Sequence, residues 1–310
     1  MMNRIRITLL LLGAAALTLP LPAQPKPAPA KPGLTRSWKQ AKTPDGQPDL
    51  QGTWVNFEST PFERAASAPA RPRATGDPSD RPFADRAPKV AARASLVVEP
   101  ESGRVPLTPW AEQQRDYALA HIQDSWEYNT PWERCITRGI PAAIFPAAYN
   151  NGYQILQTPG QVVIVYEMIH ETRIIPIDGR PHLPGVLRQW NGDPRGHWEG
   201  NTLVVETTNF NGKSMIATNA ASLRIRSVPQ TEDARITERF TRADENTINY
   251  EVTIDDAKVA STPWKIAMPL VRDDSYKIYE YMCHEANQDY MEITLGGGRL
   301  QEKNAAAGRK

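Results

Sequence analysis

The sequence predicts a mainly β protein, an antiparallel barrel or sandwich with a Pro-rich N-terminal arm and one helix. Two observations carry this prediction. Runs rich in β-branched and aromatic residues recur through the second half of the chain with turn-forming residues between them, which is typical of short antiparallel strands. Proline accounts for 28 of the 310 residues and is concentrated toward the N-terminus, where it disfavours helices and central strands.

Residues 1–23 have the pattern of a signal peptide. Arg4 and Arg6 precede an apolar run at 7–19, and Ala23 offers a small residue for cleavage. The run is shorter than the ~20 residues that span a bilayer, so we expect no membrane span. The predicted location is periplasmic or secreted.

The rest of the chain divides by composition. Residues 24–45 alternate proline with small and basic residues, which predicts an extended Pro-rich tether. We expect a single β-rich domain at 46–300, with a long loop at 63–107 where Ala, Pro, Arg and Asp dominate. Residues 301–310 are predicted to be a flexible tail.

One helix is expected within this domain, beginning at Thr108 and ending near Asp124. Thr108 is a suitable N-cap and Pro109 suits the first helical position. A single stripe of that helix carries Trp110, Gln114, Tyr117 and His121.

The strands follow in order from a first one at 48–56. The stretch 161–176 is predicted as one long strand, whose alternation turns Tyr166 and His170 inward and Glu171 and Arg173 outward. Gly200-Asn201 predicts a hairpin turn. Four further strands are expected at 236–242, 247–254, 264–271 and 276–284.

Charge limits the possible partners. Lys and Arg total 36 against 35 Asp and Glu, a net charge of +1, which disfavours a nucleic-acid binder that works by bulk charge. No glycine-rich nucleotide-binding motif and no Gly-x-Ser-x-Gly motif is present. A small-molecule ligand is the expected partner; the sequence identifies no cofactor and no oligomeric state.

The chain has two cysteines, Cys135 and Cys283, and an oxidising compartment favours a disulfide between them. Two buried free thiols, or a nucleophilic Cys283 beside His284, are the alternatives that the sequence leaves open. Zinc binding would require several histidines in addition.

Histidines and glutamates in the β-rich half suggest acid–base chemistry. Four of the five histidines lie there, and their spacing matches no metal motif such as His-Glu-x-x-His, so no metal site is assigned. Hydrogen-bonded core residues are the alternative interpretation. The catalytic candidates are His170, Tyr166, His284 and Glu285. We expect one cavity to collect His170, His182, His284, Tyr166, Arg180 and Glu285.

Two turn-type segments, 178–182 and 192–196, expose charged groups beside strands. At a barrel mouth they would hold the polar end of a ligand, and ordinary turn chemistry is the alternative. The ligand-binding candidates are Arg180, His182, Asp193 and Arg195, together with Tyr149, Asn150 and Asn151.

Five phrases stand out along the chain: TPDGQPDLQGTW (43–54), RCITRGIP (134–141), EMIHETRIIPIDGRPH (167–182), GDPRGHWEGNTLVVETTNF (192–210) and YMCHEAN (281–287). They resemble motifs of a family of secreted proteins from soil and marine bacteria. The resemblance implies an exported single-domain β-protein and brings no established activity. Gly52-x-Trp54 is similar to the opening of lipocalins, which implies a lipocalin-like barrel.

These observations favour an exported β-barrel that binds a small amphipathic ligand in a cavity with a polar mouth. The alternative is a periplasmic enzyme of lyase, isomerase or hydrolase type, which would use a His/Glu/Tyr acid–base cluster, with or without a metal.

Overall fold

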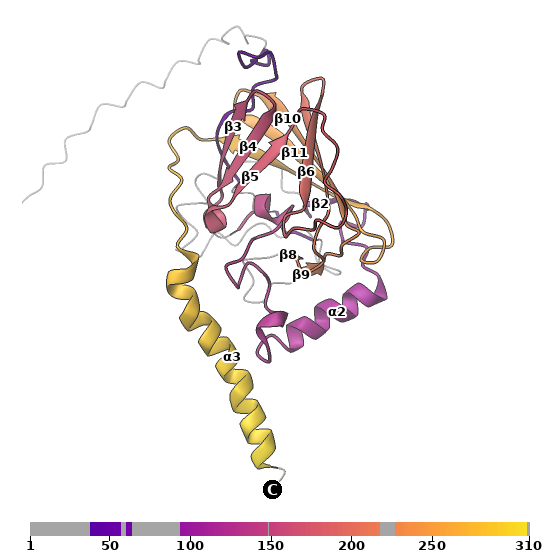
Figure 1. The fold of residues 1–310 in the computed structure, drawn as a ribbon, viewed down its shortest axis with the longest axis vertical. Helices are drawn as coiled ribbons and strands as arrows, with labels where there is room; N and C mark the ends of the chain where they lie inside the picture. The colour runs from indigo at the N-terminus through magenta and orange to yellow at the C-terminus, as the bar shows by residue number, and fades with distance from the viewer. Residues whose placement is uncertain (1–37, 57–59, 64–93, 148, 218–226, 309–310) are drawn as a thin grey trace, which may run out of the picture. The chain divides into compact units, whose positions relative to one another are not determined.

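The computed structural model describes residues 38–56, 60–63, 94–147, 149–217 and 227–308. The predicted signal peptide and residues 24–37 of the predicted tether lie outside this part of the chain. The described residues confirm a mainly β architecture in which every strand pairing is antiparallel (Figure 1).

Nine strands form a single hydrogen-bonded series in the order β5-β4-β3-β1-β12-β11-β10-β7-β6, and β2 pairs with β12 beside it. Their bounds are β1 Gly52–Val55, β2 Val97–Glu99, β3 Gly152–Thr158, β4 Gln161–Tyr166, β5 Thr172–Pro176, β6 Asp193–Glu199, β7 Thr202–Thr208, β10 Arg235–Asp244, β11 Thr247–Asp255 and β12 Trp264–Arg272. A separate hairpin joins β8 (Met215–Ala217) to β9 (Ser227–Pro229). The helical segments are α2 Pro109–Ala120, α3 Cys283–Ala307 and the short 3₁₀ turns η2 Trp126–Tyr128, η3 Ala142–Ile144 and η4 Met168–His170.

The sheet curls into a nearly closed barrel because its two end strands, β5 and β6, lie next to each other. Gly196 of β6 makes this approach possible. A Cβ atom at that position would lie 2.9 Å from Ile175 Cγ2 of β5 and 2.8 Å from Ile177 Cγ2. Only a residue without a side chain lets the two strands come this close.

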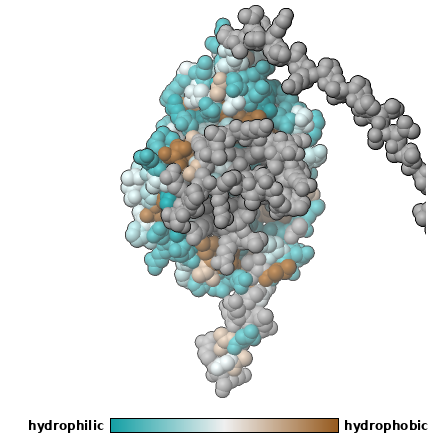
Figure 2. Space-filling model, turned by 180° about the vertical axis from the view of Figure 1, so that it is seen from behind, coloured by the Kyte–Doolittle hydropathy of each residue, from teal (hydrophilic) through white to brown (hydrophobic). Residues whose placement is uncertain are grey.

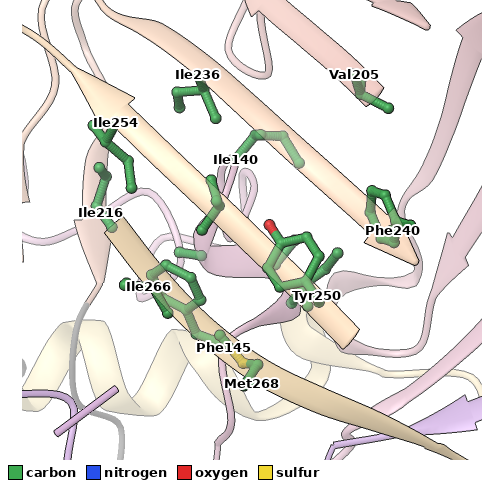
Figure 3. Packing of buried hydrophobic residues seen from close by; sticks show 14 of the residues in the cluster. Ile140, Phe145, Val205, Ile216, Ile236, Phe240, Tyr250, Ile254, Ile266 and Met268 are labelled. Carbon is green, nitrogen blue, oxygen red and sulfur yellow. The ribbon is translucent and has the colours of Figure 1, made fainter. Parts of the chain in front are cut away.

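The barrel interior is packed with large apolar side chains. Alternate residues of β10, β11 and β12 face inward, among them Phe240, Tyr250 and Ile266, all fully buried (Figure 3). Ile140 and Phe145, from the segment that contains η3, belong to the same core. Each such side chain contributes roughly 1.5–3 kcal/mol when it is fully buried. The chain therefore fills much of the barrel with its own residues.

Several predicted elements are confirmed. The strands at 236–242, 247–254 and 264–271 are β10, β11 and β12, and the Gly200-Asn201 turn connects β6 to β7. Helix α2 starts as predicted, because the Thr108 side chain accepts a hydrogen bond from Ala111 N. It ends at Ala120, four residues before the expected end.

The single strand expected at 161–176 is wrong: this stretch is a hairpin, β4 and β5, joined through η4. At the turn Ile169 and His170 adopt left-handed backbone angles, with φ of 61° and 43°. The turn reverses the alternation of the chain, so that Arg173 faces inward and Ile174 outward. Left-handed angles are rare for a β-branched residue, so the sequence pattern gives no sign of a turn at this position.

The C-terminal region also differs from expectation. Residues 276–282 form no strand, and a helix, α3, starts at Cys283 and continues through Ala307 into the predicted tail. Cys135 and Cys283 form the expected disulfide, with Cα atoms 5.7 Å apart. This leaves neither residue as a free thiol or a nucleophile.

Two segments predicted to lack structure contain some. At the end of the tether, Ala41 O accepts a hydrogen bond of 2.9 Å from Asp49 N, and Lys42 pairs with Pro48 in a β-bridge. Within the predicted loop at 63–107, β2 forms a short strand that pairs with Lys265 and Ile266 of β12.

On the face seen in Figure 2, hydrophobic residues form small separate patches among hydrophilic ones. In the described part of the chain, no helix is both long and apolar enough to cross a membrane.

Candidate functional site

A buried polar cluster lies among the inward-facing residues of the barrel. Arg173 Nη2 of β5 is 2.6 Å from Glu238 Oε2 of β10, and it donates to Thr207 Oγ1 of β7 at 2.7 Å. Tyr250 Oη donates to Glu238 Oε1 at 3.0 Å. Tyr166, the one predicted catalytic residue in the interior, is also fully buried here.

This environment determines the charge states of the cluster. Burial by itself would lower the pKa of Arg173, but the Glu238 carboxylate and Tyr166 outweigh it and raise the pKa above its ordinary value. Burial raises the pKa of the Tyr166 and Tyr250 phenols, so both stay protonated. The cluster is an internally compensated ion pair with two phenols, sealed inside the core.

The cluster contains residues that the sequence does not single out. A single strand at 161–176 would put Arg173 on the outer face, and only the hairpin turns it inward. Glu238 carried a usable signal, since it shares the period-two face of Ile236 and Phe240, both of which are apolar.

His170 does not face the barrel interior, contrary to expectation. It lies exposed at the end of η4, and its Nδ1 is 2.9 Å from Tyr281 O. His284 and Glu285 are exposed on the first turn of α3, directly after the disulfide. His182 is also partly exposed. Of the residues expected to share an interior cavity, Tyr166 therefore lies inside the barrel, and none of the three histidines does.

Three of the predicted mouth residues do come together. His182 Nδ1 is 2.9 Å from Asp193 Oδ2, and Arg195 Nη1 donates to Asp193 Oδ1 at 2.6 Å. Arg195 Nε also donates to Pro181 O at 2.8 Å, which fixes the loop between β5 and β6. Arg180 does not join them: its guanidinium pairs locally with Asp178 in solvent.

The residues predicted beside this mouth, at 149–151, lie elsewhere. Asn151 is buried and exchanges two hydrogen bonds of 2.7 Å with the Ala147 backbone, a structural role. Asn150 adopts a left-handed φ of 53°. Tyr149 is exposed, and its ring lies nearly parallel to that of Tyr281, with centroids 6.1 Å apart.

The described residues also form a cleft of about 730 Å³, which we call the aromatic cleft. It is bordered by α2, η2, the β8–β9 hairpin and the neighbouring loops, outside the barrel core. Its aromatic members are Trp110, Tyr117, Trp126, Tyr128 and Trp190. Three residues of the predicted stripe of α2, Trp110, Gln114 and Tyr117, line this cleft.

Cations lie against these rings. Arg134 Cζ is 4.4 Å from the centroid of Trp126, and Lys258 Nζ is 4.3 Å from that of Trp110. The polar lining includes four cations, Arg115, Arg134, Lys213 and Lys258, and two carboxylates, Glu127 and Glu232. Glu232 is already paired with Arg188, at 3.2 Å, and Arg115 with Asp116, at 2.9 Å. Three lining cations against one carboxylate then remain, so the cleft as a whole favours an anion.

Among the described residues, no three His, Cys, Asp or Glu side chains are grouped as metal ligands. The chain matches no protein-family model, no curated protein and no solved structure.

Proposed function

We propose that this protein is an exported binding protein, and that its aromatic cleft captures a small amphipathic ligand with a ring system and an anionic group. The observation that carries the proposal is the combination of five aromatic side chains with an excess of cations around a volume of about 730 Å³. Small-molecule sites typically occupy roughly 300–1,000 Å³ and combine apolar walls with a few polar groups.

The physical role of each group follows from its position. Trp126 and Tyr117 are both 50% exposed. Arg134 lies over one face of Trp126 and His121 stacks on one face of Tyr117, so a flat ligand would contact the other face of each ring. Arg134 and Lys258 lie beside the aromatic rings and supply charge for an anionic end. Export is supported by the N-terminal sequence and by a disulfide that is stable in an oxidising compartment.

Binding is proposed rather than catalysis because of the groups that the cleft offers. Histidine, the usual acid–base residue near neutral pH, is not among the described residues that line it. The polar cluster of Tyr166, Arg173 and Glu238 is in turn sealed in the core, where a substrate would have to displace packed side chains.

The proposal is tested by titrating the full chain with 1-naphthoate, an aromatic carboxylate, while following tryptophan fluorescence. Trp126→Ala removes a half-exposed ring of the cleft and should weaken the apparent affinity about tenfold, equivalent to ~1.4 kcal/mol. Trp38→Ala is the matched control, since Trp38 is an exposed tryptophan that does not line the cleft. The neutral analogue 1-naphthalenemethanol should bind more weakly than naphthoate. Equal affinities for the two tryptophan variants would contradict the proposal.

A further inference from the structure

Three arginines are buried in the described part of the chain, and they differ in how their charge is compensated. Arg173 has the Glu238 carboxylate at 2.6 Å. Arg242 lies over the Trp54 ring at 5.5 Å and donates through all three nitrogens to the carbonyls of Asp244, Asp49 and Glu245. Arg138 lies similarly over Trp132, at 5.0 Å, and is only 3% exposed.

Arg138 is the exception because no carboxylate of the described residues forms an ion pair with it. Its Nε and Nη1 atoms are buried without a hydrogen-bond acceptor; those of Arg173 are too, but Arg173 has the Glu238 carboxylate as its partner. An isolated buried charge costs several kcal/mol. Lysine or histidine in this position would lose its proton, whereas a guanidinium stays charged. Burial lowers the pKa of Arg138, because the charged form has lost its hydration without gaining an ion-pair partner among the described residues.

Phenols lie close to Arg138. Tyr281 packs against the small cluster that contains Trp132, the ring beneath the Arg138 guanidinium, and the Tyr149 ring stacks on that of Tyr281. Together with Tyr153, these tyrosines partly offset the effect of burial on the pKa of Arg138. Tyr153 Oη is already committed, since it donates to Ile144 O at 3.1 Å. The Tyr149 and Tyr281 hydroxyls share a hydrogen bond of 3.3 Å, so one of their two protons is used within the pair. The other proton is the phenol donor that remains for a further acceptor.

The disulfide keeps this arrangement together. Cys283, two residues after Tyr281, is bonded to Cys135, three residues before Arg138. His170 Nδ1 holds the Tyr281 carbonyl at 2.9 Å, and the buried Ile169 packs beside Trp132. These contacts hold Tyr149 and Tyr281 next to the segment that contains Arg138. Because folding has already ordered these groups, binding an anion would cost little further conformational entropy.

We propose that the Arg138 guanidinium binds a planar oxyanion, such as nitrate or the carboxylate of a small acid. Tyr149 and Tyr281 would enclose this anion site on its solvent side. A guanidinium presents a flat fork of donors that matches a trigonal oxyanion. The remaining hydroxyl proton of the Tyr149–Tyr281 pair adds a donor from the solvent side. This site is separate from the aromatic cleft, whose lining includes none of these three residues.

Thermal unfolding of the full chain at constant ionic strength tests the proposal. Formate, acetate and nitrate should raise the melting temperature relative to chloride and sulfate, because binding to the folded state stabilises it. A response to nitrate as well as to formate indicates an inorganic oxyanion site, and a response to formate and acetate alone indicates a carboxylate site.

Arg138→Met should abolish this response, and in chloride its melting temperature should equal or exceed that of the wild type, because an uncompensated charge is removed. Arg242→Met is the matched control: it removes a buried arginine that also lies over a tryptophan, so it should melt lower and keep the anion response. A purely structural Arg138 would instead make Arg138→Met melt lower in every anion.

Tyr149→Phe provides a second test that does not disturb the core, since Tyr149 is exposed. It should fold normally and bind formate several-fold more weakly by calorimetric titration. A wild type whose stability is the same in all five anions, or an Arg138→Met variant that still responds, would overturn the proposal.

Discussion

Glu171 illustrates how a single residue couples the stability of this fold to pH. Its carboxylate accepts hydrogen bonds from Thr137 Oγ1 and Asn191 Nδ2, both at 2.8 Å, and so connects three separate loops. Burial raises the pKa of Glu171, and these two hydrogen bonds only partly offset the effect. Between the unfolded value, about 4.3, and the raised folded value, the folded state holds more protons than the unfolded state. The free energy of unfolding therefore falls as pH rises through that window.

Glu171→Gln should remove this dependence, because the amide can still accept from Asn191 and donate to the Thr137 hydroxyl. The stability advantage of the wild type over Glu171→Gln is expected to shrink as pH rises from about 4, in urea unfolding at a series of pH values. Glu199→Gln is the control with the opposite sign. The hydrogen bond from Arg239 lowers the pKa of Glu199, so its contribution is lost as pH falls. Equal slopes for both variants would contradict this interpretation.

Removing one partner of the buried Arg173–Glu238 pair should lower the free energy of unfolding strongly. Replacing both partners with apolar residues should lower it much less. Arg173→Met leaves a carboxylate alone in the core and is expected to cost about 3–5 kcal/mol in urea unfolding. The double variant Arg173→Met/Glu238→Met should be more stable than Arg173→Met, because it leaves no unpaired charge. Arg239→Met, one residue from Glu238 but on the exposed face, is the control and should have a much smaller effect. A double variant as unstable as the sum of both single changes would mean that packing, rather than charge, dominates.

At the scale of elements, the contact between β5 and β6 closes the barrel. Gly196→Ala would place a Cβ within 3 Å of the Ile175 and Ile177 side chains, so the strands must separate or the isoleucines must shift. We expect a loss of about 1–3 kcal/mol in the free energy of unfolding. Gly185→Ala is the matched control, since nothing lies within 4 Å of the position that its Cβ would occupy. A Gly196→Ala variant as stable as the control would show that this closure is loose.

At the scale of the whole molecule, the sequence predicted what depends on local pattern. Alternation and turn residues predicted β10, β11 and β12, and capping residues predicted the start of α2 at Thr108. The two cysteines and the expected compartment favoured the disulfide. The hairpin at 161–176 escaped prediction because its turn uses Ile169 in a left-handed conformation instead of Gly or Asn.

The candidate site was less accessible to sequence reasoning, because it is made by residues that are distant in the chain. Trp110, Trp126 and Trp190 come from α2, η2 and the loop before β6, and each was compatible with ordinary packing. The histidine pattern favours a site in the barrel interior. In the structure His170, His182 and His284 instead lie at the surface, and apolar residues fill the interior. Which cleft remains open is a property of tertiary packing, and no local pattern reports it.

The ligand site that we propose lies in the aromatic cleft, outside the packed barrel. A crystal structure of the full chain with 1-naphthoate tests it most directly. We expect the naphthyl ring beside Trp126 or Trp110, with the carboxylate of the ligand toward Arg134 or Lys258. Naphthoate inside the barrel against Tyr166 and Arg173, with the cleft empty, would contradict it.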